Sequence, residues 1–600
     1  MAESIYEEGE PKASSSSSPP SSQAYDSHIH RLPTYEEQND EDGCRRSFLR
    51  RFLDSFKRDP NAHVLRQLGA DGKVYDLEEA AAATAASPLH RRLKSRHLQM
   101  IAIGGSIGTG LFVGSGKSLA DGGPASVLIA FGVIGVMIFS TVHALGEMAV
   151  LFPVAGSFSA FSTRFLDPAW GFAMGWNYAL QWLVILPLEI VAASMTVSYW
   201  PSGISPAVWV VIFYTLIVGI NMLGVKGYGE AEFTFSVIKV IAVIGFIILG
   251  IVLNIGGGPG GSYIGGKYWR DPGAFNHGFR GLCSVFVNAA FAFAGTELVG
   301  LAAAEASNPR KALPTAVRQV FWRITLFYIS ALTVVGLLVP YTDPRLLSAS
   351  SKADAKASPF VIAIKNAGIA GLDSVMNVVI MIAVISVGNS SVYGSSRTLA
   401  ALAEQRQAPH FLSYIDRRGR PLYAILVASA VGLLSFLAAS SRQEEAFTWM
   451  MAISGLSSIF TWTSICLAHI RFRRGWKVQG HSLDELAFVS QPGVIGSWIA
   501  VLLNILILAA QFWTGVDPVD LSEDTARARV ENLFSLYLAV PIVILFYFPY
   551  KIWFRTRIIR AADMDLQTGR RDFNVAQLLA EERAERASWP LIKRIYRFFC

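Results

Sequence analysis

Long apolar segments recur along most of this chain and constrain its fold more than any other feature. They start near His97 and stop near Phe554, and many approach or exceed the roughly 18 residues that a helix needs to cross a bilayer. Only 16% of the 600 residues are charged and 52% are hydrophobic, whereas soluble domains carry about 25% charged residues. We therefore predict an all-α polytopic membrane protein, because lipid offers no other partner to backbone polar groups.

The apolar pattern predicts about twelve transmembrane helices. Their expected ranges are 97–119, 124–151, 170–199, 206–224, 232–254, 279–303, 316–340, 373–402, 421–439, 445–470, 494–514 and 531–554. Residues 97–554 would then form the transmembrane domain, between an N-terminal tail (1–96) and a C-terminal tail (555–600). The N-terminal tail contains a serine run followed by two prolines, a low-complexity pattern that predicts a largely disordered segment. Within it, the alanine-rich stretch 78–86 can form a helix before the first span.

The basic residues predict the orientation. They concentrate in the loops after even-numbered spans and at the edges of those loops: Arg164; Arg310, Lys311 and Arg318; Arg406, Arg417, Arg418 and Arg420; Arg471, Arg473, Arg474 and Lys477. The positive-inside rule places these loops, and both tails, in the cytoplasm. This placement accounts for the net charge of +7 without a nucleic-acid partner. The four cysteines lie far apart and form no CxxC pair, so the sequence supports neither a disulfide framework nor a metal site.

The first span carries four glycines in the seven residues from Gly104 to Gly110. Each glycine costs a helix about 1 kcal/mol relative to alanine, so the helix is expected to be broken here. Backbone N–H groups freed at the start of the outer half-helix suit a carboxylate. The expected binding residues are Ser106, Ile107, Gly108, Thr109 and Gly110. Alternatively, the glycines serve only close helix packing.

The sixth span repeats this theme at Phe293, Ala294, Gly295 and Thr296. The second interrupted span comes five spans after the first. This spacing predicts an inverted five-plus-five repeat with a binding site near the membrane midplane. Carbonyls freed in residues 293–296 would accept an ammonium group while the first break holds a carboxylate, a pairing that fits an α-amino acid. The Phe293 ring either covers such a site or is ordinary packing.

Ionisable side chains inside apolar spans are costly, at about 2.5–3.5 kcal/mol each, and usually functional. The clearest cases are Glu147, Glu189, Lys239 and Glu297. Glu297 lies beside the second break, so a proton or substrate role is the leading interpretation, and a buried structural hydrogen bond is the alternative. Glu147 follows His143 by four residues on one helical face, which fits a proton role or a structural ion pair equally well. A lysine such as Lys239 supplies either a fixed or a titrating positive charge.

Several motifs together give the chain a resemblance to the fungal amino-acid permeases of the amino acid–polyamine–organocation superfamily. The resemblance runs from about His97 to Cys600. Its marks are GGSIGTGLFVGSG (104–116), GEM (146–148), RFLDPAWGFAMGWNY (164–178), GTELVG (295–300), EASNPRKALP (305–314), SPFV (358–361), SSRTLAALA (395–403), HIRFRRGW (469–476) and HSLDELAF (481–488).

The resemblance implies the leucine-transporter type of five-plus-five inverted repeat. It also implies proton-coupled amino-acid uptake at the plasma membrane. The break at 106–110 would hold the substrate carboxylate and residues 293–296 its ammonium group. Glu297 matches the family's glutamate at the second break, and Lys239 resembles the lysine whose charge replaces sodium in sodium-independent relatives.

The tails resemble regulatory segments of the same family. Cys600 would be a lipidation site because the family's terminal cysteine can be palmitoylated. Lys12 is a candidate for ubiquitylation, which would make the ubiquitylation machinery a partner of the tails.

Two other functions remain open from the sequence. One is an amino-acid sensor that signals more than it transports, which the long tails permit. The other is an amino-acid exchanger. An enzyme is not expected, because no nucleophile arrangement, metal cluster or cofactor motif is found, and no cofactor is expected.

Overall fold

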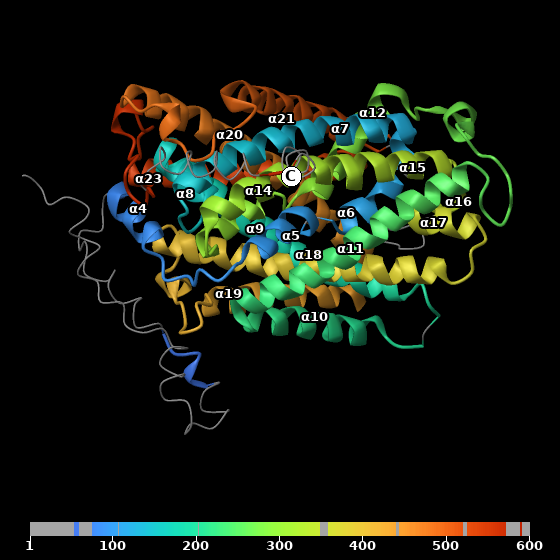
Figure 1. Cartoon of the computed structure of the whole chain (residues 1–600), viewed down its shortest axis with the longest axis horizontal. Helices are drawn as coiled ribbons and strands as arrows, with labels where there is room; N and C mark the ends of the chain where they lie inside the picture. Colours follow the sequence, from blue (N-terminus) through green and yellow to red (C-terminus); the bar gives the residue numbers. More distant parts are fainter. Residues whose placement is uncertain are drawn as a thin grey trace, which may run out of the picture. The chain divides into compact units, whose positions relative to one another are not determined.

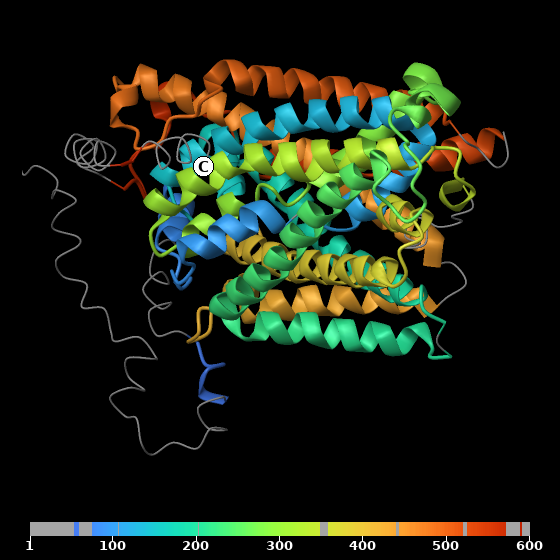
Figure 2. The same cartoon turned by 45° about the vertical axis from the view of Figure 1, so that its right-hand side comes forward.

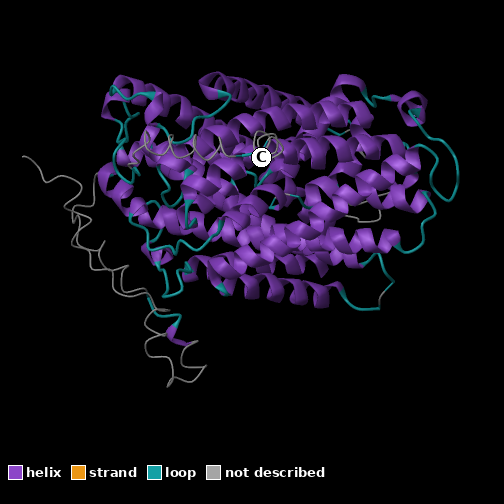
Figure 3. Ribbon diagram, in the orientation of Figure 1, coloured by secondary structure: helices purple, strands orange, loops and turns teal. Residues whose placement is uncertain are grey.

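Nearly all of the described chain is helical. The computed structural model describes residues 53–58, 75–105, 107–201, 203–347, 358–439, 443–519, 525–571 and 589–590. All of these belong to one unit, Phe52–Cys600. Over these ranges the structure contains no β-strand, only isolated bridges (Figure 3).

The first seven predicted spans correspond to helices that are often interrupted. Span 1 comprises α5 (Ser95–Gly104), α6 (Thr109–Phe112) and the first part of α7 (Gly114–Leu151), whose second part is span 2. Spans 3 to 5 are α9 (Pro168–Val197), α10 (Pro206–Met222) and α11 (Gly224–Asn254). Span 6 comprises α12 (Gly278–Phe293), α13 (Leu298–Leu301) and the 3₁₀-helix η3 (Ala302–Glu305). Span 7 comprises α14 (Pro309–Trp322), the π-helix η4 (Arg323–Ser330) and α15 (Ala331–Leu338).

The last five spans are more regular. They are α18 (Leu372–Glu404), α19 (Leu422–Gly432) continued by η7 (Leu433–Ala439), α20 (Gln443–Val478), α21 (Gly493–Val516), and the pair α22 (Ala526–Tyr537) and α23 (Ala539–Phe554). Among the described residues, eight helical stretches are long and apolar enough to cross a membrane when spans 6 and 7 are each counted as one, and the pair α22 and α23, bent by 55°, adds a ninth. The broken first span and the shorter apolar helices α10 and α19 complete the twelve predicted spans.

The chain turns between spans 1 and 2 inside α7. Gly123 has φ 78° and ψ 169°, outside the helical region. A Cβ atom at this position would lie 2.8 Å from the Ala274 carbonyl oxygen, and the N–H of Ala125 donates to that same oxygen. A positive φ and a close backbone approach both favour glycine, so this residue ends the first span and starts the second.

Shorter elements connect the spans. They are α4 (Leu77–Ala85), α8 (Phe158–Phe165), η2 (Trp269–Gly273), α16 (Pro344–Leu347), α17 (Pro359–Asn366), η6 (His410–Ser413), η8 (Leu483–Glu485) and η9 (Ala561–Asp563). Helix α4 confirms the helix predicted before the first span. The Asp76 side chain caps it by accepting from the N–H groups of Glu78 and Glu79, as an N-cap aspartate does.

The packing repeats itself between spans 1–5 and spans 6–10. Helix α5 packs on α11 as α12 packs on α20, and α9 packs on α20 as α18 packs on α11. Likewise α10 contacts both α9 and α18, while α19 contacts the same two helices (Figures 1 and 2). Because each half has an odd number of spans, the second half crosses the membrane in the opposite sense. This arrangement is the five-plus-five inverted repeat expected from the sequence.

The outer helices expose many large apolar side chains, more than is usual on the surface of a soluble protein. On α21, Ile495 is 75% exposed and Leu502 57%, and on α11 Ile241 is 66% exposed. Soluble monomers rarely expose contiguous apolar patches larger than a few hundred Å². These faces therefore meet lipid, while the buried faces of the same helices form the protein core.

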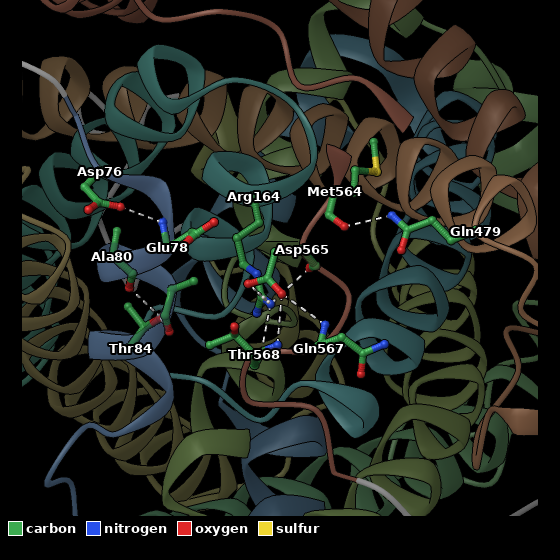
Figure 4. A network of polar contacts seen from close by, with 11 residues as sticks. Asp76, Glu78, Ala80, Thr84, Arg164, Gln479, Met564, Asp565, Gln567 and Thr568 are labelled. Atoms are coloured by element: carbon green, nitrogen blue, oxygen red, sulfur yellow. Dashed lines mark hydrogen bonds and ion pairs between the residues drawn. The ribbon is translucent and has the colours of Figure 1, made fainter. Parts of the chain in front are cut away.

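The segment after the last span is packed against the helices as far as Arg571. The Nη2 atom of Arg164 on α8 donates to the Asp565 carboxylate at 2.9 Å and to the Thr568 carbonyl at 2.8 Å (Figure 4). Gln479 at the end of α20 donates to the Met564 carbonyl at 2.8 Å. Burial alone would raise the pKa of Asp565, but Arg164 and nearby backbone N–H groups outweigh it and hold that pKa below its usual value. This ion pair is therefore intact at neutral pH.

Part of the predicted N-terminal tail is also ordered. Residues 53–58 and 75–96 are described. The buried Arg420 guanidinium donates to the Ser55 hydroxyl at 3.2 Å, and the Arg417 N–H donates to the Lys57 carbonyl at 2.9 Å. A buried guanidinium needs several acceptors; Asp416 and the Met222 carbonyl provide two for Arg420, and Ser55 in the N-terminal segment provides the others. Composition alone gave no sign of this contact.

Candidate binding site between two broken helices

The first break lies where the glycines predicted it. Helix α5 ends at Gly104 and α6 begins at Thr109, with Gly108 in an extended conformation between them. The N–H groups of Gly108 and Thr109 find no acceptor among the described residues, as expected at the start of a helix. The Ile107 N–H is already bonded to the Gly104 carbonyl at 3.1 Å. Ser106 lies outside the described residues.

The second break separates α12 from α13. Gly295 has φ 93°, a conformation that favours glycine. The Phe293 carbonyl accepts from the N–H and the hydroxyl of Thr296, and the Gly295 carbonyl accepts from the Leu298 N–H. The carbonyls of Ala294 and Thr296 accept no hydrogen bond from the described residues. Two of the four predicted acceptors are thus occupied, because the break closes on itself in tight turns.

The two broken spans touch. A Cβ atom added to Gly110 would overlap the Cα of Ala292 and lie 2.8 Å from its Cβ and 2.9 Å from its backbone nitrogen. Helix α6 therefore packs backbone to backbone on α12, one residue before the second break. Both breaks are buried, so the N–H and carbonyl groups left without a partner lie inside the protein, on two spans that are in contact.

Glu189 and Lys239 attach the first break to the surrounding helices. The Thr109 hydroxyl donates to Glu189 on α9 at 2.5 Å, and the Lys239 ammonium on α11 donates to the Gly104 carbonyl at 2.5 Å. Both ionisable side chains are almost completely buried. The structure thus brings to the first break two of the four groups singled out from the sequence.

Glu297 joins the second break to α20. Its carboxylate accepts from the Trp462 indole N–H at 3.1 Å and from the Gly295 N–H at 3.2 Å. The side chain is 1% exposed. A carboxylate in this position fixes the conformation of the break and can also hold a proton. Its location beside the break is the one predicted.

Phe293 belongs to an aromatic stack at the end of α12. Its ring lies 4.1 Å from that of Tyr328 and 5.9 Å from that of Phe131, centroid to centroid. The Tyr328 hydroxyl donates to the Ala292 carbonyl, and the buried Arg323 donates to the Ala102 carbonyl, both at 2.7 Å. The ring is thus packed against two other aromatic rings, and a covering role over the site stays a prediction. Arg323 was not identified from the sequence, although its position as a basic residue inside the predicted seventh span would have indicated a buried charge.

Glu147 is not part of either break. It accepts from Arg473 at 2.7 Å, from the Ser490 N–H at 2.6 Å and from His469 at 3.2 Å. His143, predicted as its neighbour, bonds its own helix at the Phe139 carbonyl instead. These contacts tie α7 to α20 and to the segment before α21, so the structural ion pair is the better interpretation.

Glu232 was missed. It lies 0% exposed on α11 and accepts from the Ser386 hydroxyl at 2.8 Å on both carboxylate oxygens. Its Oε1 atom is 3.5 Å from the Lys239 ammonium. The spacing of seven residues between Glu232 and Lys239 was a usable signal, because residues two helical turns apart share one face. The predicted span started at residue 232, whereas α11 starts at Gly224, so Glu232 stood at the first position of the predicted span and was not among the ionisable groups singled out.

Comparison with known proteins places these observations in a family. The model of the family described as amino acid permease matches residues 97–561. The chain belongs to the amino acid permease family. A general amino-acid permease of Candida albicans is 60% identical over 556 residues, covering 92% of this permease and 93% of the relative. A general amino-acid permease of Saccharomyces cerevisiae is 55% identical, with 92% and 91% covered, and a histidine permease of the same yeast is 50% identical, with 85% and 86% covered.

Family membership confirms the resemblance inferred from the motifs. The permease is a multi-pass membrane protein that carries amino acids across a membrane, and it belongs with transporters rather than enzymes. Cys600 and Lys12 lie outside the described residues, so lipidation and ubiquitylation stay predictions.

Proposed function

We propose that this permease is an amino acid–proton symporter of the plasma membrane that works by alternating access, with both tails in the cytoplasm. The observation that carries the proposal is the contact between the two broken spans at Gly110 and Ala292. It puts helix-start N–H groups and unpaired carbonyls on two elements that meet inside the protein. The basic loops after the even-numbered spans support the orientation.

The proposed substrate contacts use only backbone groups. The N–H groups of Gly108, Thr109 and Gly110 hold the carboxylate at the positive end of the outer half-helix. The carbonyls of Ala294 and Thr296 accept from the ammonium group. Because neither set involves the substrate side chain, a broad range of amino acids fits, in keeping with the names of the two general permeases among the relatives.

The proposed proton-coupling groups are Glu297 and Lys239. Each is buried and each bonds directly to a break or to the residue next to it. A change in the charge of either group changes the hydrogen bonding of the break, so proton binding and substrate binding are physically linked. The proposal does not extend to Glu147, whose partners all lie elsewhere.

Collapse of the proton gradient tests the coupling. In cells that lack other amino-acid permeases, an uncoupler should lower the steady-state accumulation of a labelled amino acid at least about tenfold, since the gradient drives uphill uptake. If accumulation is unchanged by the uncoupler, proton symport is rejected. Uptake that requires amino acid already inside the cell would identify an exchanger, and binding without accumulation a sensor.

A further inference from the structure

A fully buried ion pair lies directly behind the first break. Lys239 and Glu232, both on α11, are each 0% exposed. The Lys239 ammonium donates to the Ser386 hydroxyl on α18 at 2.8 Å, and that hydroxyl donates to Glu232 at 2.8 Å. Ser386 thus sits between the two charged groups and is bonded to both.

This pair also holds the end of α5. Lys239 donates to the carbonyl of Gly104, the last residue of α5. Ser236 lies between the two charged residues on α11, and its hydroxyl is within hydrogen-bond distance of two acceptors, the Met100 carbonyl at 3.2 Å and the Glu232 carboxylate at 3.3 Å. A Cβ atom at Gly104 would overlap the Ser236 side chain, so α5 rests on α11 at this point. Any inward or outward movement of α5 must change the contact with Lys239.

The surrounding charges make Glu232 the principal partner of Lys239. The other charged groups acting on Lys239 are Glu189 on α9 and Arg323 on η4. Glu189 is engaged by Thr109 and Arg323 by the Ala102 carbonyl. Besides Lys239, the titratable group facing Glu232 is Tyr228, whose hydroxyl bonds Ser390 at 3.2 Å. A buried ion loses most of its stabilisation when its partner is neutralised, so the charges of Lys239 and Glu232 depend on each other.

We propose that Glu232 is the proton partner of Lys239 in the transport cycle, with the Ser386 hydroxyl carrying the proton between them. In this step an Nζ–H bond of Lys239 breaks as an O–H bond forms on Ser386. The original O–H bond of Ser386 breaks as an O–H bond forms on Glu232. The ion pair becomes a neutral amine and a carboxylic acid, and no other reactant is needed.

The step has a mechanical consequence at the break. A charged ammonium makes a hydrogen bond roughly twice as strong as a neutral donor does. When Lys239 becomes neutral its hold on the Gly104 carbonyl weakens, and α5 is released to move. The inference rests on the proposed proton symport and assigns the proton acceptor that the symport requires.

Two variants separate proton handling from structure. Glu232→Gln removes the acceptor, and Ser386→Ala removes the carrier while leaving the ion pair. Glu230→Gln is the matched control for the first, because Glu230 lies on the same helix but its side chain is 42% exposed and pairs with Arg96 at the surface. Ser391→Ala is the control for the second, because among the described residues the Ser391 hydroxyl donates to a carbonyl of its own helix, that of Gly388.

The measurements are uphill accumulation of a labelled amino acid, exchange in preloaded cells, and the amount of protein at the surface. Exchange needs no proton release, because the loaded protein can reorient and return. We expect Glu232→Gln and Ser386→Ala to lower accumulation at least about tenfold, with exchange kept within about threefold of the parent. Both controls should accumulate like the parent.

Normal accumulation by both variants would overturn the inference. Equal loss of accumulation and exchange by both would also overturn it, because that result describes a structural role. If Glu232→Gln does not reach the surface, Ser386→Ala decides by the same criteria. If accumulation by the parent protein does not respond to the uncoupler, the proposed symport itself is refuted. If the parent responds but both variants accumulate normally, only the role of Glu232 is refuted.

Discussion

Replacing Gly110 by alanine is expected to lower amino-acid uptake by about 10- to 100-fold. The new methyl group would overlap the backbone of Ala292, and backbone atoms cannot turn aside as a flexible side chain does. Overpacking of this kind costs about 1–3 kcal/mol, and each 1.4 kcal/mol is a factor of about ten. The cost falls on a contact between the two spans that carry the breaks, so binding suffers more than folding. Uptake kinetics normalised to surface protein measure the effect.

Gly114→Ala is the matched control. Gly114 lies four residues further along the same broken span and is also buried, but the nearest atom to its added Cβ, the Thr109 carbonyl oxygen, is 3.8 Å away. We expect this variant to transport like the parent. Equal activity in the Gly110 and Gly114 variants would show that the breaks do not need this close approach.

Replacing Glu297 by glutamine is expected to lower uptake by about 10- to 100-fold while surface delivery is kept. The glutamine cannot carry a charge, and hydrogen bonds to a charged group are worth about 1.5–3 kcal/mol. The variant loses the carboxylate that holds both the Gly295 N–H and the Trp462 indole. It also loses a group able to release a proton. Uptake of a labelled amino acid and surface labelling are measured together.

Trp462→Phe separates the two losses. It removes one donor to the carboxylate and leaves the titratable group in place, so uptake should fall less than in the glutamine variant and stay sensitive to an uncoupler. Normal uptake by Glu297→Gln would remove this residue from the mechanism.

The apolar pattern predicted the spans and the breaks because both are local properties of the sequence. The four glycines between Gly104 and Gly110 disfavour a helix whatever surrounds them in the fold. The second break likewise lies at Gly295, where the sequence of the sixth span predicted it. The pairing of the two breaks followed from their separation by five spans. These features need no knowledge of distant contacts.

The ionisable groups could not be sorted from the sequence, because their roles depend on partners far away along the chain. Glu147 looked like a candidate beside His143, yet Arg473 and Ser490 from later segments hold it. Glu232 was not singled out at all, yet it is buried and the Ser386 hydroxyl on α18 donates to its carboxylate. The number of free carbonyls at the second break was also hidden, since turns inside the break use the carbonyls of Phe293 and Gly295.

The proposed site between the two breaks recognises the carboxylate and ammonium groups common to all α-amino acids. Competition of labelled uptake by modified amino acids tests this most directly. An amino-acid amide lacks the carboxylate and an N-acetyl amino acid lacks the ammonium group, so each should compete at least about tenfold more weakly than its parent, given the 1.5–3 kcal/mol of a charged hydrogen bond. Amino acids with different side chains should still compete. An amide or an N-acetyl derivative that competes as well as its parent would contradict recognition by the two broken helices.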